Sequence, residues 1–179
     1  TMTTVPKRLL TPEEYLAKER KAQYKSEYYD GEMFAMLGAS REHNLIAGNV
    51  NGEARNQLRG RPCEVYQSDM RVKVSRTGLY TYPDVVIVCG EPRFEDAEVD
   101  TLLNPTVIFE VLSESTEGYD RGKKSEHYRR ISSLREYALI AQDRCHVERF
   151  TRQPDDRWTL WETDDLQAVL ELPSVGCEL

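Results

Sequence analysis

The sequence contains no long hydrophobic run. Its apolar segments have the length of strands, whereas a membrane-spanning helix needs about 20 consecutive apolar residues. Residues 1–21 also lack the apolar segment of a secretory signal. We therefore expect a soluble, cytoplasmic protein with no membrane partner. Its 179 residues suit a single domain, and we expect residues 1–10 to form a flexible tail.

Cysteine and histidine are too sparse and scattered to form a recognisable metal motif. The four cysteines include no C-x-x-C pair, and the three histidines form no H-E-x-x-H motif. We interpret the cysteines as free thiols in a reducing cytosol, in preference to a zinc site or a disulfide framework.

An excess of positive charge is also absent. The chain has 31 acidic and 24 basic residues, a net charge of −7 and a pI of about 5.1. This balance argues against a protein that coats nucleic acid through its overall electrostatic field. Binding through a local basic patch is still compatible with it.

Several local signals predict where helices and hairpins begin. Thr11 as N-cap and Pro12 as first helical residue predict a helix start. The Asp30–Gly31 pair between two strand-like runs predicts a hairpin. Ser40 is the expected N-cap of a second helix, whose apolar spacing continues to Gly60.

The rest of the chain alternates strand-like and helix-like segments. A helix is expected over residues 119–133, and a hairpin around Asp143–Arg144 joins two of the strands. We predict strands over residues 63–75, 80–90, 104–113, 136–142, 146–153, 157–162 and 168–173. This intermixing favours an α/β (α+β) domain with a mixed β-sheet core flanked by helices.

Two carboxylates stand on the two most apolar strands. Asp84 begins the run PDVVIV, and Glu110 lies inside PTVIFEVLS. If these strands are neighbours, about 4.8 Å apart, both side chains can converge on one hard divalent cation. Alternatively, Asp84 caps a turn after Pro83, and Glu110 pairs with an arginine. Together on adjacent strands the carboxylates favour a functional site, because unpaired buried charge is costly.

The predicted helix after Glu110 contains one lysine that helical spacing directs inward. Lys124, Tyr128 and Ile131 lie at positions i, i+4 and i+7, which puts Lys124 on the apolar face. Lys123 falls on the more polar face. The alternative is an ordinary lysine whose aliphatic stem covers the edge of the core.

The same segment is locally basic. Residues 121–135 carry six positive side chains and one negative, a local charge of +5. The positive side chains at Arg121, Lys123, Arg129 and Arg130 are candidates for contacting nucleic-acid phosphates. A solvated helix face is the simpler interpretation.

These motifs together resemble a known family. YPDVVIV, NPTVIFEVLSEST and YDRGKKSEHYRRISSLREYALI are similar to the Uma-type family of restriction-endonuclease-like proteins, in the PD-(D/E)XK nuclease superfamily. The segment SEYYDGEMFAMLGASREHNLIAGNVN resembles the family's entry segment. The resemblance covers roughly residues 11–141.

The resemblance implies a restriction-endonuclease-like sheet core and an active site that binds Mg²⁺ or Mn²⁺. It maps the family's metal-binding carboxylates onto Asp84 and Glu110. In the mechanism that we hypothesise, the Val111 carbonyl is a further metal ligand. The sequence departs from the superfamily pattern at Leu112, where the E-x-K lysine usually stands. The resemblance implies that Lys124 supplies this lysine from the following helix.

Three further residues match recurrent family positions. Glu27 is a candidate additional acidic ligand, and His43 is a candidate proton shuttle or phosphate contact. A local hydrogen bond at a helix start is the alternative for His43. Asp69 also matches, and we interpret it as structural.

The leading hypothesis is a metal-dependent endonuclease whose substrate is nucleic acid, in the first place DNA. The alternative is a catalytically degenerate nuclease fold that binds nucleic acid or protein as a homodimer; Leu112 and the acidic pI motivate it. A third hypothesis is a structural homodimer, with Trp158 and Trp161 in its interface.

Overall fold

The computed structural model describes residues 7–179, so most of the tail predicted over residues 1–10 lies outside the described residues. No helix in this part of the chain is long and apolar enough to cross a membrane. The helical elements are α1 (Pro12–Glu19), α2 (Arg41–Gln57), α3 (Glu117–Tyr119), the π-helical turn η1 (Asp120–Lys124) and α4 (Ser125–Tyr128).

A six-stranded mixed sheet forms the centre of the molecule. Its strand order is β11-β10-β9-β8-β6-β3, and only β8 and β9 run parallel. The strands are β3 (Cys63–Gln67), β6 (Val85–Cys89), β8 (Val107–Leu112), β9 (Glu136–Ala141), β10 (Val147–Arg152) and β11 (Trp158–Thr163). Every residue of β8 is buried, as expected for a central strand.

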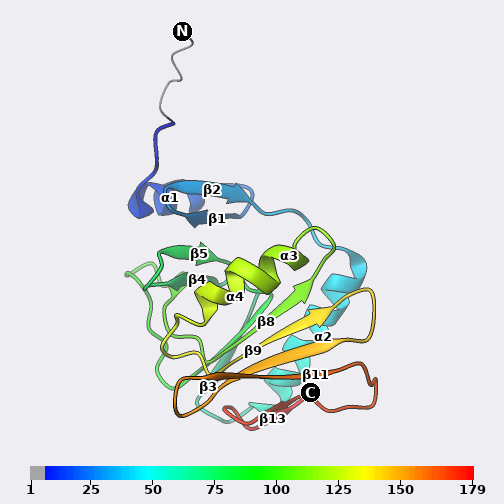
Figure 1. The fold of residues 1–179 in the computed structure, drawn as a ribbon. Helices are drawn as coiled ribbons and strands as arrows, with labels where there is room; N and C mark the ends of the chain where they lie inside the picture. The colour runs from blue at the N-terminus through cyan, green and yellow to red at the C-terminus, as the bar shows by residue number, and fades with distance from the viewer. Residues whose placement is uncertain (1–6) are drawn as a thin grey trace.

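A five-stranded sheet packs beside it, in the order β2-β1-β5-β4-β7. Its strands are β1 (Ser26–Tyr29), β2 (Glu32–Ala35), β4 (Arg71–Val74), β5 (Leu79–Thr81) and β7 (Thr101–Leu102). A separate small hairpin pairs β12 (Glu171–Leu172) with β13 (Cys177–Glu178). Figure 1 shows β1, β2 and α1 at the N-terminal end of the molecule, above β4 and β5.

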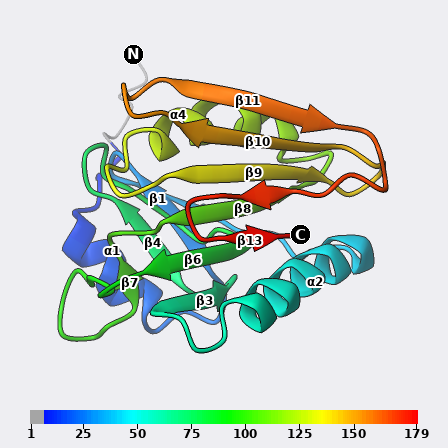
Figure 2. The same cartoon turned by 90° about the horizontal axis from the view of Figure 1, so that it is seen from below.

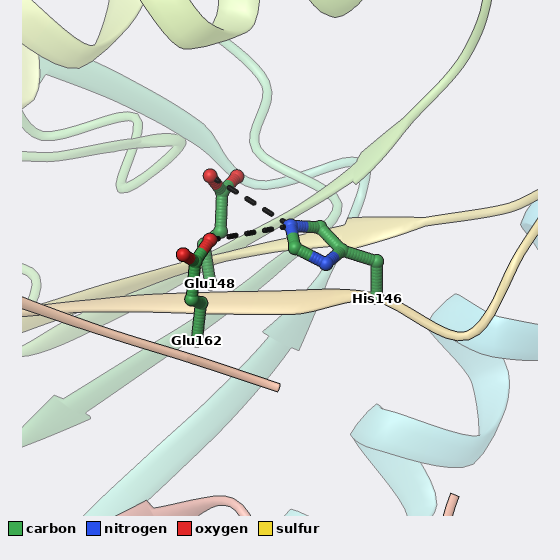
Figure 3. A group of neighbouring side chains, drawn as sticks. All are labelled: His146, Glu148 and Glu162. Carbon is green, nitrogen blue, oxygen red and sulfur yellow. Dashed lines mark ion pairs between the residues drawn. The ribbon is translucent and has the colours of Figure 1, made fainter. Parts of the chain in front are cut away.

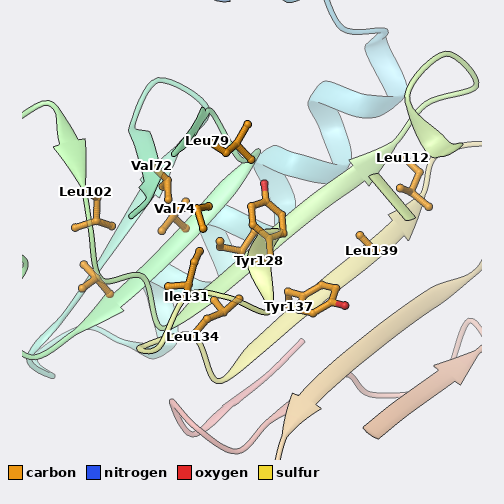
Figure 4. Packing of buried hydrophobic residues seen from close by; sticks show 13 residues of the cluster. Val72, Val74, Leu79, Leu102, Leu112, Tyr128, Ile131, Leu134, Tyr137 and Leu139 are labelled. Atoms are coloured by element: carbon orange, nitrogen blue, oxygen red, sulfur yellow. The ribbon is translucent and has the colours of Figure 1, made fainter. Parts of the chain in front are cut away.

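Helices cover both faces of the six-stranded sheet. The α3–η1–α4 segment lies over one face (Figure 1), where Tyr128 and Ile131 join a buried cluster with residues of both sheets (Figure 4). Helix α2 lies over the other face (Figure 2), where Ala54 and Leu58 pack with the β12–β13 hairpin in a second cluster. The core therefore has two apolar layers, with β8 between them.

The local start and turn signals are confirmed. Thr11 caps α1 with a reciprocal capping box, and the Ser40 side chain caps α2. Strands β1 and β2 are antiparallel around the Asp30–Gly31 turn, where both residues have positive φ, as the two-residue hairpin signal predicts. Strands β9 and β10 likewise form an antiparallel hairpin.

Two of the strand predictions were wrong, because the structure divides each predicted segment between two strands. Residues 63–75 form β3 and β4, and residues 80–90 contain part of β5 and all of β6; in both cases the two strands belong to different sheets. A turn at residues 68–70 separates the first two strands. Pro83, which has no N–H to donate to a ladder, stands between the other two.

The helix predicted over residues 119–133 begins earlier and ends earlier. Helical structure runs from Glu117 to Tyr128 and includes the wider η1 turn. The Ser125 hydroxyl donates to the Asp120 carbonyl, five residues back, at 2.6 Å. Such an inserted side-chain bond is one way in which a wider turn is accommodated inside a helix.

The interpretation of all four cysteines as free thiols was wrong for two of them. Cys63 and Cys89 form a disulfide between β3 and β6, where they are direct cross-strand partners. Their 26-residue separation matches no short cysteine motif, so only the strand register brings them together. Cys145 and Cys177 are free.

Candidate active site

The register of two core strands brings the carboxylates of Asp84 and Glu110 together. Strand β6 is antiparallel to β8, with Val85 opposite Phe109. Extending this register by one residue places Asp84 opposite Glu110. The Asp84 Oδ2 atom accepts a hydrogen bond from the backbone N–H of Val111 at 2.7 Å. Asp84 is therefore held against the strand that carries Glu110.

His43 reaches the same carboxylate from α2. Its backbone N–H donates to the Ser40 side chain at 3.0 Å, so the N-terminal cap fixes the start of this helix. The His43 Nε2 atom lies 3.2 Å from Asp84 Oδ1, and both side chains are largely buried. The two oxygens of Asp84 thus have different partners, one on β8 and one on α2.

Glu110 is buried, with 4% of its surface exposed. The ammonium of Lys124 lies 3.0 Å from Glu110 Oε1, and the Tyr128 hydroxyl donates to the same oxygen. Both partners come from the helical segment that covers this face of the sheet. These contacts offset part of the desolvation cost that an isolated buried charge would carry.

Lys124 contacts two further carboxylates. Its Nζ atom lies 3.3 Å from Glu27 Oε1 and 3.6 Å from Asp120 Oδ1. The Thr81 hydroxyl donates to Glu27 Oε1 at 3.0 Å. We call Glu27, His43, Asp84, Glu110, Asp120, Lys124 and Tyr128 the Lys124 cluster. It joins both sheets, α2 and the α3–η1–α4 segment around one ammonium group.

Burial and mutual repulsion shift the acid–base properties of this cluster. Burial raises the pKa of Glu110 well above its usual value, with Asp84 and Asp120 adding repulsion and Lys124 opposing the shift. Burial likewise raises the pKa of Asp120. The hydrogen bond to Asp84 is the main cause of a raised pKa at His43, with burial opposing it and the Val111 backbone contributing. For Glu110 and Asp120, the effect of burial therefore outweighs the favourable interaction with the Lys124 ammonium.

The donor set of the Lys124 cluster fits a hard divalent cation. Four carboxyl groups stand against one ammonium and one imidazole, so the acidic groups outnumber the basic ones by two, and a bound cation would favour the ionised form of the buried carboxyl groups. Carboxylate oxygens are the ligands that Mg²⁺ and Mn²⁺ prefer. Asp84, just before β6, and Glu110, opposite it on β8, are the residues that would hold such an ion.

All five predicted catalytic residues lie in this cluster. Asp120 and Tyr128 also belong to it, although neither was among the predicted site residues. A signal for both was available, because Asp120, Lys124 and Tyr128 follow one another at intervals of four and therefore share one side of a helix. The sequence alone does not say which residues of the sheets lie opposite this side of the helix.

The residue at position 112, where the superfamily pattern usually has a lysine, is part of the core. Leu112 is 2% exposed and belongs to the apolar cluster beneath α4 (Figure 4). A lysine there would replace part of this packing. Lys124 enters the same region from the covering segment and places its ammonium 3.0 Å from Glu110.

Of the four side chains predicted to contact nucleic acid, two form ion pairs or hydrogen bonds within the molecule and two are exposed. Arg121 pairs with Glu117 at 2.9 Å and also with Glu148. Arg129 donates to the Tyr137 hydroxyl at 2.9 Å. Lys123 and Arg130 are exposed. Outside this group, Asp69, interpreted as structural, forms an exposed ion pair with Lys25 at 3.0 Å.

Comparisons with known proteins agree with this architecture. The crystal structure of a protein from Anabaena variabilis ATCC 29413, described as "a putative nuclease", superposes with a TM-score of 0.70 at 17% identity, over 92% of this chain and 89% of that one. At this identity the likeness shows a shared fold.

Two relatives come from Synechocystis sp. (strain ATCC 27184 / PCC 6803 / Kazusa), and both are described as uncharacterized proteins. The protein sll1609 is 36% identical over 95% of this chain and 96% of its own length. The protein slr1290 is 35% identical over 93% of this chain and 86% of its own length. A family model named Uma2, described as "Putative restriction endonuclease", matches residues 12–179. The chain therefore belongs to the Uma2 family, with a nuclease-like fold.

Proposed function

We propose that this protein is a metal-dependent endonuclease that hydrolyses phosphodiester bonds of DNA. The observation that carries the proposal is the position of Lys124, whose Nζ atom lies 3.0 Å from Glu110 Oε1. Its ammonium stands beside Glu110, which the strand register places opposite Asp84, although the lysine comes from a different element than the superfamily pattern expects. The description of the Uma2 family, "Putative restriction endonuclease", favours DNA as the substrate.

Asp84, Glu110 and the backbone carbonyl of Val111 are the proposed ligands of Mg²⁺ or Mn²⁺. A divalent cation at these oxygens supplies a Lewis acid that polarises a phosphodiester oxygen and lowers the pKa of a bound water. His43, Asp84 and Glu27 are the less deeply buried members, with 16%, 13% and 12% of their side chains exposed. We therefore expect the phosphodiester to approach from the side of these three residues.

The other cluster residues have proposed roles that follow from their contacts. Lys124 orients the attacking water or stabilises the negative charge that develops on the phosphoryl group. Glu27 holds the ammonium of Lys124 in place at 3.3 Å and is a further acidic ligand candidate. His43, beside Asp84, is positioned to transfer a proton, and its raised pKa keeps more of it protonated near neutral pH.

The proposed DNA contacts lie on the outer side of the same helical segment. Lys123, Arg129 and Arg130 line one surface hollow together with Tyr29. Arginine and lysine side chains bind phosphate oxygens without reading sequence. Arg121, a fourth candidate, can contribute only if it leaves its carboxylate partners.

Nicking of supercoiled plasmid in the presence of Mg²⁺ tests this proposal. We expect the wild-type protein to nick the plasmid, EDTA to stop the reaction, and Glu110→Ala or the isosteric Glu110→Gln to lose at least roughly a hundredfold in rate. Glu171→Gln, at an exposed glutamate on β12 outside both the Lys124 cluster and the proposed DNA contacts, is the matched control and should nick normally.

Equal nicking by wild-type and Glu110 variants would refute the assignment. Absence of both nicking and Mg²⁺ or Mn²⁺ binding in calorimetric titrations would favour the degenerate scaffold instead.

A further inference from the structure

A second group of metal-ligating side chains lies at the edge of the six-stranded sheet, outside the Lys124 cluster. His146 precedes β10, Glu148 lies within it, and Glu162 lies on β11. One potential ligand atom from each of the three lies within 4.8 Å of the others. Figure 3 shows the imidazole directed toward both carboxylates. We call these three residues and Asp164 the His146 cluster.

The strand register makes this arrangement unfavourable without a cation. Glu148 and Glu162 are direct cross-strand partners in the β10–β11 pair, and like charges in such positions are destabilising. Asp164, just beyond the end of β11, adds a third carboxylate. The arginine nearby, Arg121, pairs with Glu148 but also with Glu117. Three carboxylates therefore stand beside one arginine that is shared with Glu117, and negative charge is in excess unless a cation binds.

The imidazole of His146 is oriented as in a metal ligand. Its Nδ1 atom is bonded to Asp164 Oδ1, which favours the tautomer with the proton on Nδ1 and leaves the Nε2 lone pair free. The Nε2 atom lies 3.9 Å from Glu148 Oε1 and 3.7 Å from Glu162 Oε2. A carboxylate that fixes the far nitrogen of a ligating histidine is a recurrent feature of metal sites.

The two oxygens of Glu148 have separate partners. Oε1 faces the imidazole, whereas Oε2 forms an ion pair with the Arg121 guanidinium. The ligating oxygen is thus directed toward the site by an arginine that belongs to the η1 turn, the turn that also carries Lys124. His146 and Glu148 have only 14% and 11% of their side chains exposed, while Glu162, at 56%, leaves the site open to solvent.

From this geometry we propose a second cation site, formed by His146 Nε2, Glu148 Oε1 and Glu162 Oε2, with Asp164 as the positioning residue. One imidazole and two carboxylates suit a borderline cation such as Zn²⁺, which accepts nitrogen and oxygen ligands, better than Mg²⁺, which favours oxygen. Solvent completes the coordination on the open side. The site is structural: it holds β10 and β11 together beside Glu148 and Arg121.

Calorimetric titration of the tag-free, full-length protein with Zn²⁺ tests the site without measuring DNA cleavage. The wild-type protein should bind one equivalent saturably, and its melting temperature should rise with Zn²⁺ concentration. Removing the imidazole in His146→Ala, or one carboxylate in Glu162→Gln, should weaken binding by more than roughly tenfold. Asp164→Asn should weaken it by about 10- to 100-fold through loss of ligand orientation.

Three controls make the result decisive. Glu171→Gln, at an exposed glutamate on β12, and Cys145→Ser, beside His146, should bind Zn²⁺ like the wild-type protein. Glu110→Gln should also keep Zn²⁺ binding, which separates this site from the proposed catalytic one.

Unchanged Zn²⁺ affinity in both His146→Ala and Glu162→Gln would overturn the proposal. No Zn²⁺ binding by the wild-type protein, or binding that only Cys145→Ser abolishes, would overturn it as well. Should His146→Ala fail to fold, the Zn²⁺ affinity of the exposed Glu162→Gln variant decides between the two outcomes by itself.

Discussion

Carboxylates surround the Lys124 ammonium in one cluster and the His146 imidazole in the other, yet the two clusters differ in how deeply their side chains are buried. Glu110 and Lys124 are each about 4% exposed, whereas Glu162 at the sheet edge has 56% of its side chain exposed. In the buried cluster the carboxylates come from both sheets and from the covering helical segment. In the edge cluster all members lie on or beside two adjacent strands.

This difference determines what each cluster can do. Burial amplifies electrostatic interactions and raises the pKa of Glu110 and Asp120, so the buried cluster is sensitive to the loss or gain of a single positive charge. At the edge, water screens the exposed carboxylates of Glu162 and Asp164, and ligand type decides which cation fits. The two clusters should therefore respond differently to equivalent changes.

Removing the buried ammonium should have the largest effect on stability. We expect Lys124→Gln to lower the free energy of unfolding by about 3–5 kcal/mol, because it leaves buried carboxylates without their cation. Denaturant unfolding of the variant and the wild-type protein measures this. Lys123→Gln, at the neighbouring exposed position, is the matched control and should change stability by less than about 0.5 kcal/mol.

The loss in Lys124→Gln should depend on pH. The folded-state pKa of Glu110 is raised above 4.5, so the folded state binds protons more readily and stability falls as pH rises from that value toward the folded pKa. Without the ammonium this fall should be steeper, and the deficit should be larger at about pH 8 than at about pH 5. A deficit independent of pH would contradict the charge balance described for the Lys124 cluster.

Breaking the pair between His43 and Asp84 should have a smaller effect. The pKa of His43 is raised above 6.5, so the stability that this pair contributes is fully present below pH 6.5 and is lost as pH rises through the folded pKa. His43→Gln should therefore cost on the order of 1.5 kcal/mol at about pH 6 and less at about pH 9.

His127 provides the matched control, because burial lowers its pKa below 6.5. Its contribution is present above pH 6.5 and is lost as pH falls through the folded pKa, which is the reverse of His43. His127→Gln should therefore show the opposite pH dependence. Parallel pH profiles for the two variants would contradict the assignment of the His43–Asp84 pair.

The smallest effect is expected at the sheet edge. In metal-free protein, Glu162→Gln should change the free energy of unfolding by no more than about 0.5 kcal/mol, because it removes one exposed charge from a repulsive cross-strand pair. Thermal melts in EDTA measure this. A decrease in the free energy of unfolding comparable with that of Lys124→Gln would show that the edge carboxylates stabilise the metal-free fold. That result would contradict the proposed difference between the two clusters.

Much of the site could be predicted because its members lie at positions that local patterns identify. Asp84 and Glu110 interrupt apolar strands, and helical spacing directs Lys124 inward. Both inferences need only the periods of strands and helices. The match of Glu27 and His43 to family positions added two residues that periodicity does not single out.

What could not be predicted depends on which strands are neighbours. The disulfide between Cys63 and Cys89 follows from the β3–β6 register, and the His146 cluster follows from the β10–β11 register. The division of residues 63–75 and 80–90 between two sheets also depends on which strands pair. In each case the sequence pattern is compatible with several pairings, and tertiary packing selects one.

The most direct test of the central claim is anomalous diffraction from crystals soaked in Mn²⁺. We predict an anomalous peak coordinated by Asp84 and Glu110, with Lys124 still beside Glu110, and loss of that peak in Glu110→Gln. A well-ordered Lys124 cluster without Mn²⁺ at Asp84 and Glu110, in protein that nicks DNA under the same conditions, would contradict the proposed metal centre.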